Sequence, residues 1–137
     1  MLHKIILAAV SGILLTGSFP ETGLSWLAWF ALLPLLIAVR DLEFRQSFRL
    51  GLLTGLVHYL TLLYWLSYTM KTFGHLPVYL CIPVLFLFSF YLALYIALFS
   101  GMFSRISSGP LLSFFMIPVL WVALEYVRSF LFTGFPW

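Results

Sequence analysis

The stretch LPVYLCIPVLFLFSFYLALYIALFSGMF, residues 76–103, decides the fold class of this chain. It contains no acidic or basic side chain, and it is longer than the roughly 20 apolar residues with which a helix crosses the hydrocarbon core of a bilayer. The stretch is apolar without a break rather than at every second position, which favours a helix. It is predicted to cross a membrane with a tilt, or to begin as an interfacial segment near Pro77 and Pro83.

Four further apolar runs lie outside this stretch, separated by polar or turn-forming residues. Working outward, they cover residues 111–132, 50–70, 24–39 and 4–19. Hydrophobic residues make up 64% of the chain and charged residues only 8%, against about 25% charged in soluble domains. The mean hydropathy of +1.12 agrees. We therefore predict one all-α domain over residues 1–137, a polytopic transmembrane helical bundle of about five spans.

The first run also resembles a secretory signal peptide. His3 and Lys4 precede the apolar residues 5–15, as the basic region of such a peptide precedes its apolar region. However, Phe19 and Pro20 stand where a cleavage site needs small residues, which favours an uncleaved span. Either interpretation leaves the orientation of the remaining runs unchanged.

The basic residues between the runs predict that orientation, because cytoplasmic loops carry an excess of lysine and arginine. A cytoplasmic N-terminus places five basic residues inside, which are Lys4, Arg40, Arg45, Arg49 and Arg105, and leaves Lys71 in an external loop. The C-terminus then lies outside. Since the basic residues are dispersed between apolar runs, the net charge of +3 indicates topology rather than nucleic-acid binding.

Glu125 and Arg128 are ionisable residues inside the run 111–132. Such residues are costly in a membrane segment, and they often mark a functional site. Their spacing of three places both on one face of a helix. One interpretation is an ion pair that holds the bundle together. The other is a polar patch near the outer surface that contacts a lipid headgroup or positions a following domain.

The remaining candidate residues predict packing rather than chemistry, and neither a metal site nor a cofactor is expected. His58 and His75 are isolated from other metal-ligating residues, so we expect His58 to be a hydrogen-bonded packing residue and His75 to be solvated. Cys81 is the single cysteine, and its apolar surroundings predict packing rather than a nucleophile.

Two patterns within residues 50–70 indicate contacts. Gly51 and Gly55 have the G-x-x-x-G spacing that lets a second helix approach closely. Aromatic residues gather toward the outer end of the same run, and these are Tyr59, Tyr64, Trp65 and Tyr68. They are expected in the core or in an interfacial belt, or alternatively along a groove for acyl chains and headgroups.

Several short strings occur in an order that covers almost the whole chain. They are FP at 19–20, WLAW at 26–29, YWL at 64–66, FGHLP at 73–77 and PVLW at 118–121. The most specific string is LFTGFPW at 131–137, which follows Glu125 and Arg128. In this order they resemble the amino-terminal membrane domain of the apolipoprotein N-acyltransferase family. The residues that carry the family motif here are Tyr64, Trp65, Gly74, Thr133, Gly134, Phe135, Pro136 and Trp137.

The resemblance implies a bacterial inner-membrane enzyme that transfers an acyl chain from a phospholipid to the N-terminal cysteine of a lipoprotein. In that family the chemistry belongs to a periplasmic nitrilase-like domain, in which a Glu, Lys and Cys triad forms a thioester intermediate. We expect that domain to be missing from this chain, so no catalytic residue is assigned.

The resemblance thus implies a fragment that scaffolds the enzyme and binds lipid substrate without being catalytic alone. The implied partners are a phospholipid acyl donor, a lipoprotein acceptor, membrane lipid and the missing nitrilase-like domain, and no nucleic acid. The alternative is a standalone small membrane protein, either a transporter subunit or a structural anchor.

Overall fold

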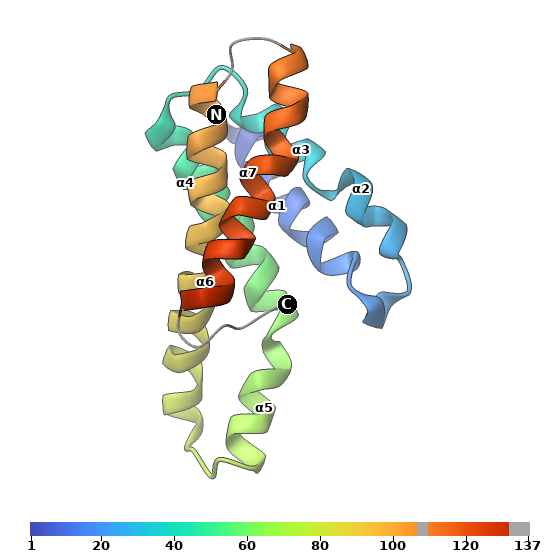
Figure 1. Ribbon diagram of the computed structural model, residues 1–137. Helices are drawn as coiled ribbons and strands as arrows, with labels where there is room; N and C mark the ends of the chain where they lie inside the picture. Colours follow the sequence, from blue (N-terminus) through green and yellow to red (C-terminus); the bar gives the residue numbers. More distant parts are fainter. Residues whose placement is uncertain (107–109, 132–137) are drawn as a thin grey trace.

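The computed structural model describes residues 1–106 and 110–131, which form helices joined by turns (Figure 1). The first part contains α1 (Leu2–Gly17), the 3-10 turns η1 (Pro20–Thr22) and η2 (Ser25–Leu27), α2 (Ala28–Ala31) and α3 (Leu33–Val39). The second part contains α4 (Phe44–Leu62), α5 (Tyr64–Thr72), α6 (Val78–Ile106) and α7 (Pro110–Phe130). The all-α prediction is confirmed for the part of the chain that the structure describes.

The helices form a bundle around α4 and α6, which lie side by side (Figure 1). Helix α1 packs against α4, and α7 packs against α6. After the turn at η1, where Gly23 adopts a positive φ of 70°, α2 and α3 run back along α1. Helix α5 and the first half of α6 form a hairpin that extends beyond the rest of the bundle.

Two glycines bring α4 and α6 into close contact. A Cβ atom at Gly55 would lie 2.7 Å from both Cα and Cβ of Ala93, and one at Gly51 would lie 2.7 Å from the carbonyl oxygen of Ile96. Packed side chains do not approach so closely, so only glycine permits this separation of the two helices. The helix contact predicted from the G-x-x-x-G spacing is therefore present.

The apolar run 50–70 is not one straight helix, which corrects the prediction of a continuous span. Helix α4 ends at Leu62, α5 begins at Tyr64, and the two are bent by 44°. The hydroxyl of Thr61 donates to the carbonyls of Val57 and His58 at 2.6 and 2.9 Å. Such side-chain bonds compete with the backbone hydrogen bonds of the last helical turn, which allows the helix to end there.

The run 24–39 is also interrupted, into η2, α2 and α3. Pro34 lies in the first turn of α3. Proline has no backbone N–H, and its ring crowds the carbonyl four residues earlier, so it is favoured in the first turn of a helix and weakens a helix interior, although α6 and α7 continue through Pro83 and Pro118. The break near Leu32 follows from the proline.

Helix α6 is long and apolar enough to cross a membrane by itself. The bent pair of α4 and α5 is also long and apolar enough if the two helices are taken together as one span. Helix α1 and the segment Ser25–Val39 are apolar but shorter. Within the described residues, length and composition thus indicate one or two crossings, fewer than the five predicted. Many large apolar side chains are exposed along the bundle, for example Trp29, Leu87 and Phe114.

Three separate parts of the chain meet at one end of the bundle, which we call the basic end. Lys4 donates through Nζ to the carbonyl of Arg40 at 3.2 Å, and the Arg105 guanidinium lies 5.7 Å from the centre of the Phe44 ring. The start of α1, the connection between α3 and α4, and the end of α6 therefore lie together. The η1 turn and the turn between α5 and α6 lie away from this end (Figure 1).

Candidate functional site

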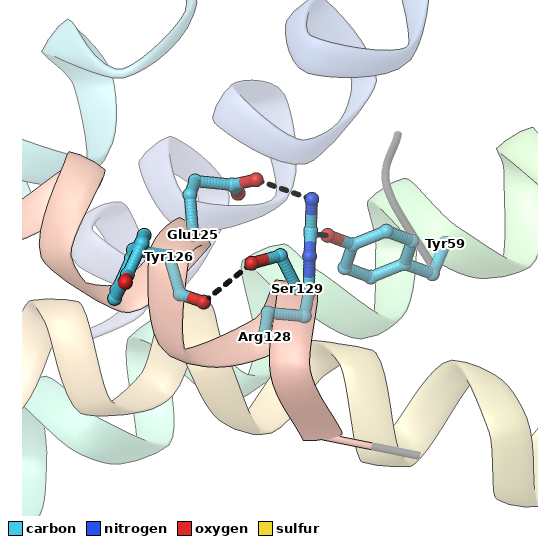
Figure 2. Close-up of polar contacts among 5 residues, drawn as sticks. All are labelled: Tyr59, Glu125, Tyr126, Arg128 and Ser129. Carbon is cyan, nitrogen blue, oxygen red and sulfur yellow. Dashed lines mark hydrogen bonds and ion pairs between the residues drawn. The ribbon is translucent and has the colours of Figure 1, made fainter. Parts of the chain in front are cut away.

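Arg128, in the last turn of α7, is a charged side chain with only 5% of its surface exposed. A buried guanidinium requires a partner of opposite charge and hydrogen-bond acceptors, because its removal from water is otherwise too costly. The structure supplies both, and Figure 2 shows the guanidinium between a carboxylate and a phenol.

The carboxylate belongs to Glu125, one turn earlier on α7, and it accepts a hydrogen bond and forms an ion pair with Arg128. This ion pair is the one that the spacing of three predicts. Glu125 is 35% exposed, so one member of the pair is buried and the other reaches the surface of the cavity described below. The pair therefore places a charged oxygen where a small molecule can approach it.

The phenol belongs to Tyr59 of α4, whose hydroxyl oxygen accepts a hydrogen bond from Arg128 at 2.9 Å (Figure 2). Tyr59 is itself buried, with 6% of its surface exposed. This bond joins residues that are 69 positions apart in the chain. It connects the end of α7 to α4, so Arg128 also has a structural role.

His58 adjoins Tyr59 and extends the polar group toward α1. Its Nδ1 lies 3.0 Å from the hydroxyl of Thr16, which in turn lies 2.7 Å from the hydroxyl of Thr61. The His58 ring contacts the ring of Phe19, with 5.8 Å between centroids. The prediction that His58 is a hydrogen-bonded packing residue is confirmed. Its neighbours place it beside the candidate site as well.

A cavity of about 380 Å³ lies where α1, α4, α6 and α7 meet. Its lining combines polar and apolar residues, which are Ser18, His58, Tyr59, Glu125 and Arg128, and Leu15, Phe19, Ile96, Trp121 and Val122. A second, shallow and wholly apolar groove on α7 shares Val122 with the cavity and continues past Val119 and Tyr126. A cavity with charged and polar residues in its lining, continuous with an apolar groove, suits an amphiphilic molecule.

The other predicted residues lie elsewhere. Tyr64 and Trp65 begin α5, and Gly74 lies in the turn after it, where a Cβ atom would lie 2.7 Å from the Met70 carbonyl oxygen. None of these three lines the cavity. Thr133, Gly134, Phe135, Pro136 and Trp137 lie outside the described residues. The structure thus joins Glu125 and Arg128, and it separates them from the motif residues at α5.

The remaining candidates, Cys81 and His75, do not line the cavity either. Cys81 is buried, and its thiol lies 3.7 Å from the carbonyl oxygen of Leu76. His75 is exposed in the turn between α5 and α6, with a positive φ of 50°. The burial of Cys81 and the exposure of His75 agree with the sequence interpretation of a packed cysteine and a solvated histidine.

Sequence reasoning missed the contribution of Tyr59, Thr16 and Ser18. Tyr59 was recognisable as one of several aromatic residues in an apolar run, but no pattern indicated which phenol would reach Arg128. The sequence offered only a general indication. A guanidinium has five N–H donors, so a buried arginine is expected to use a further acceptor besides its carboxylate. Thr16 and Ser18 gave no signal, since they appear in the sequence as ordinary residues before a turn.

Residues 11–137 match the family model described as the apolipoprotein N-acyltransferase N-terminal domain. An apolipoprotein N-acyltransferase of Geobacter metallireducens is 44% identical over 132 residues, covering 96% of this chain and 25% of that enzyme. Those of Ralstonia nicotianae and Chromobacterium violaceum are 32% and 31% identical, covering 96% and 100% of this chain and 26% and 27% of those enzymes. This chain spans about a quarter of the length of the curated relatives it matches.

Proposed function

Since this chain belongs to the apolipoprotein N-acyltransferase N-terminal domain family, we propose that it is the amino-terminal membrane part of such an enzyme, one that scaffolds it and binds its lipid substrate. Acyl transfer itself would need a catalytic nitrilase-like domain. The proposed substrates of the whole enzyme are a phospholipid acyl donor and a lipoprotein acceptor.

The observation that carries this proposal is the Glu125–Arg128 pair beside a cavity inside an apolar bundle. A purely structural anchor has no need of a buried arginine next to a cavity, because apolar packing would stabilise it as well. The charged and polar residues of the cavity can contact the phosphate and ester oxygens of a phospholipid, and the groove past Val122 can contact an acyl chain.

The proposed placement is a multi-pass domain in the bacterial inner membrane with five spans. These are α1, the segment Ser25–Val39, the bent pair of α4 and α5, α6, and α7. The distribution of charge supports a cytoplasmic basic end. In this orientation the end of α7 and the cavity lie toward the periplasm, beneath the proposed position of the catalytic domain.

Lipid binding is tested by photocrosslinking in membranes with a phosphatidylethanolamine that carries a photoreactive acyl chain. Val122 is 63% exposed and lies where the cavity meets the groove, so Val122→Trp should block the site without disturbing Arg128. We expect crosslinking to α7 to fall severalfold. Val127→Trp is the matched control, because Val127 is also an exposed valine of α7 and lines neither space. Equal crosslinking in both variants would contradict the proposal.

The non-catalytic role has a separate test. The 137-residue chain, supplied with phospholipid and a diacylated lipoprotein peptide, should transfer no acyl group. Transfer that Cys81→Ala abolishes would assign the chemistry to this chain and refute that part of the proposal.

A further inference from the structure

The basic end carries an excess of positive over negative side chains. In the described part of the chain it contains five basic residues against the two carboxylates of Asp41 and Glu43, and the basic residues are Lys4, Arg40, Arg45, Arg49 and Arg105. All four arginines are exposed. Within residues 1–106 and 110–131 the side-chain ion pair is the distant one between Glu125 and Arg128, so the charge of this end faces its surroundings.

Two of these arginines border a cavity of about 460 Å³ between the start of α4 and the end of α6. Its lining consists of Glu43, Phe44, Arg45 and Arg105. Two guanidinium groups and one carboxylate leave this space with an excess of positive charge. A guanidinium presents paired N–H donors that match the oxygens of a phosphate.

Packing holds one of the two guanidinium groups in place. A Cβ atom at Gly101 would lie 2.7 Å from Cε2 of Phe44, so the glycine allows the phenylalanine ring to rest directly on α6. The ring in turn lies under the Arg105 guanidinium, at 5.7 Å. A cation held over an aromatic face loses less freedom when it binds a ligand than a freely moving side chain does.

The neighbouring surface of α6 is apolar. Leu98 and Met102 are 38% and 41% exposed, and their spacing from Arg105 places all three on one face of the helix. A molecule that extends along this face meets apolar side chains first and then a guanidinium. This is the order of groups in a phospholipid, whose acyl chains lie in the hydrocarbon and whose phosphate lies at its border.

We propose that Arg45 and Arg105 form a binding site for the phosphate of an anionic phospholipid in the leaflet at the basic end. Its acyl chains lie along Leu98 and Met102. The site rests on the membrane placement proposed above and not on acyl transfer, because it shares no lining residue with the Arg128 cavity. The bound lipid is structural and is not consumed.

The test measures phosphatidylglycerol binding to the whole protein in phosphatidylcholine nanodiscs, by native mass spectrometry. A hydrogen bond to a charged group contributes about 1.5 kcal/mol or more, which corresponds to roughly tenfold in affinity. Arg45→Gln and Arg105→Gln should therefore each weaken binding about tenfold. Glu43→Gln, which removes the carboxylate from the same cavity, should strengthen it.

Arg49→Gln is the matched control, because it removes an exposed arginine of α4 at the same end that does not line the cavity. It should weaken binding clearly less than either cavity substitution does, because Arg49 adds only to the general positive charge of the basic end and makes no direct contact with the phosphate. An equal loss for Arg49→Gln would show a diffuse charge effect and overturn the site. So would equal affinity for phosphatidylglycerol and phosphatidylcholine, or displacement of the lipid by inorganic phosphate at similar concentration.

Discussion

Glu125 and Tyr59 are partners of Arg128 with different consequences. Its ion pair with Glu125 lies within one helix, so it neutralises charge without joining separate elements. Its bond to Tyr59 joins α7 to α4 across the bundle. The Tyr59 phenol therefore fixes the position of α7 against α4, whereas Glu125 balances the charge of Arg128. Substituting Tyr59 alone removes the first contribution and leaves the second.

Tyr59→Phe should destabilise the bundle by about 1 to 2 kcal/mol, because the substitution keeps the ring and removes an acceptor from a buried charge. The measurement is the free energy of unfolding in mixed micelles. Tyr126→Phe is the control, since Tyr126 is a tyrosine of α7 with 66% of its surface exposed, and it should change stability little. Equal effects would mean that the Tyr59 hydroxyl contributes nothing specific to Arg128.

The sequence predicts the ion pair at Arg128 and not the cavity around it. A spacing of three along one helix is enough to bring Glu125 and Arg128 together. The bond to Tyr59 and the place of Ser18 in the cavity lining depend on how α1, α4 and α7 are placed, and that placement is set by packing over the whole bundle. Short-range patterns contain no information of this kind.

At the scale of the helix, small residues determine how closely α4 approaches its neighbours. Gly51 and Gly55 face α6, while Thr54 faces α1, where its carbonyl oxygen would lie 2.6 Å from a Cβ atom at Gly12. The hydroxyl of Thr54 also donates to the carbonyl of Ala8 at 2.8 Å. Helix α4 is therefore held closely on two sides.

Gly55→Ala should destabilise the bundle by about 1 to 3 kcal/mol, because the added methyl group would force α4 away from Ala93. The better helix propensity of alanine offsets at most about 1 kcal/mol of this. Gly17→Ala is the control, since a Cβ atom there meets Leu27 at an ordinary 3.4 Å. It should leave the unfolding free energy unchanged or raise it. Similar losses at both positions would argue against close packing at Gly55.

The helices differ in how far the sequence predicts them. Helix α6 covers most of its predicted apolar run. The break in the run 24–39 lies next to Pro34, and the effect of proline on a helix can be predicted from the sequence. The break at Leu63 has no such signal, because neither glycine nor proline lies between Gly55 and Gly74. It arises where hydroxyls, including one from α1, bind the carbonyls of the last turn of α4.

For the whole molecule, the two ends of the bundle differ in charge and chemistry. One end gathers exposed arginines, and the other end has the η1 turn and the hairpin of α5 and α6 (Figure 1). Under the proposed orientation they face opposite sides of the inner membrane. This arrangement can be tested without knowledge of any substrate.

Single cysteines should report these two sides in intact cells, with Cys81→Ala as the background. Phe73→Cys lies in the turn after α5 at a position with 76% exposure, and a membrane-impermeant thiol reagent should label it from outside. Glu43→Cys, at the basic end, should be labelled only after the inner membrane is opened. The reverse pattern would invert the orientation, and labelling of both positions from outside would contradict the span arrangement.

The contact between α1 and α4 has a consequence for the order in which the protein is made. Helix α1 leaves the ribosome first, and its partner α4 follows some distance behind. During that interval the hydroxyl of Thr16 has no access to His58, yet lipid offers it no acceptor. Its bond to the Gly12 carbonyl, at 3.1 Å, lies within α1 itself and satisfies the hydroxyl in the meantime. The same threonine is thus suited both to a helix alone in the bilayer and to the assembled bundle.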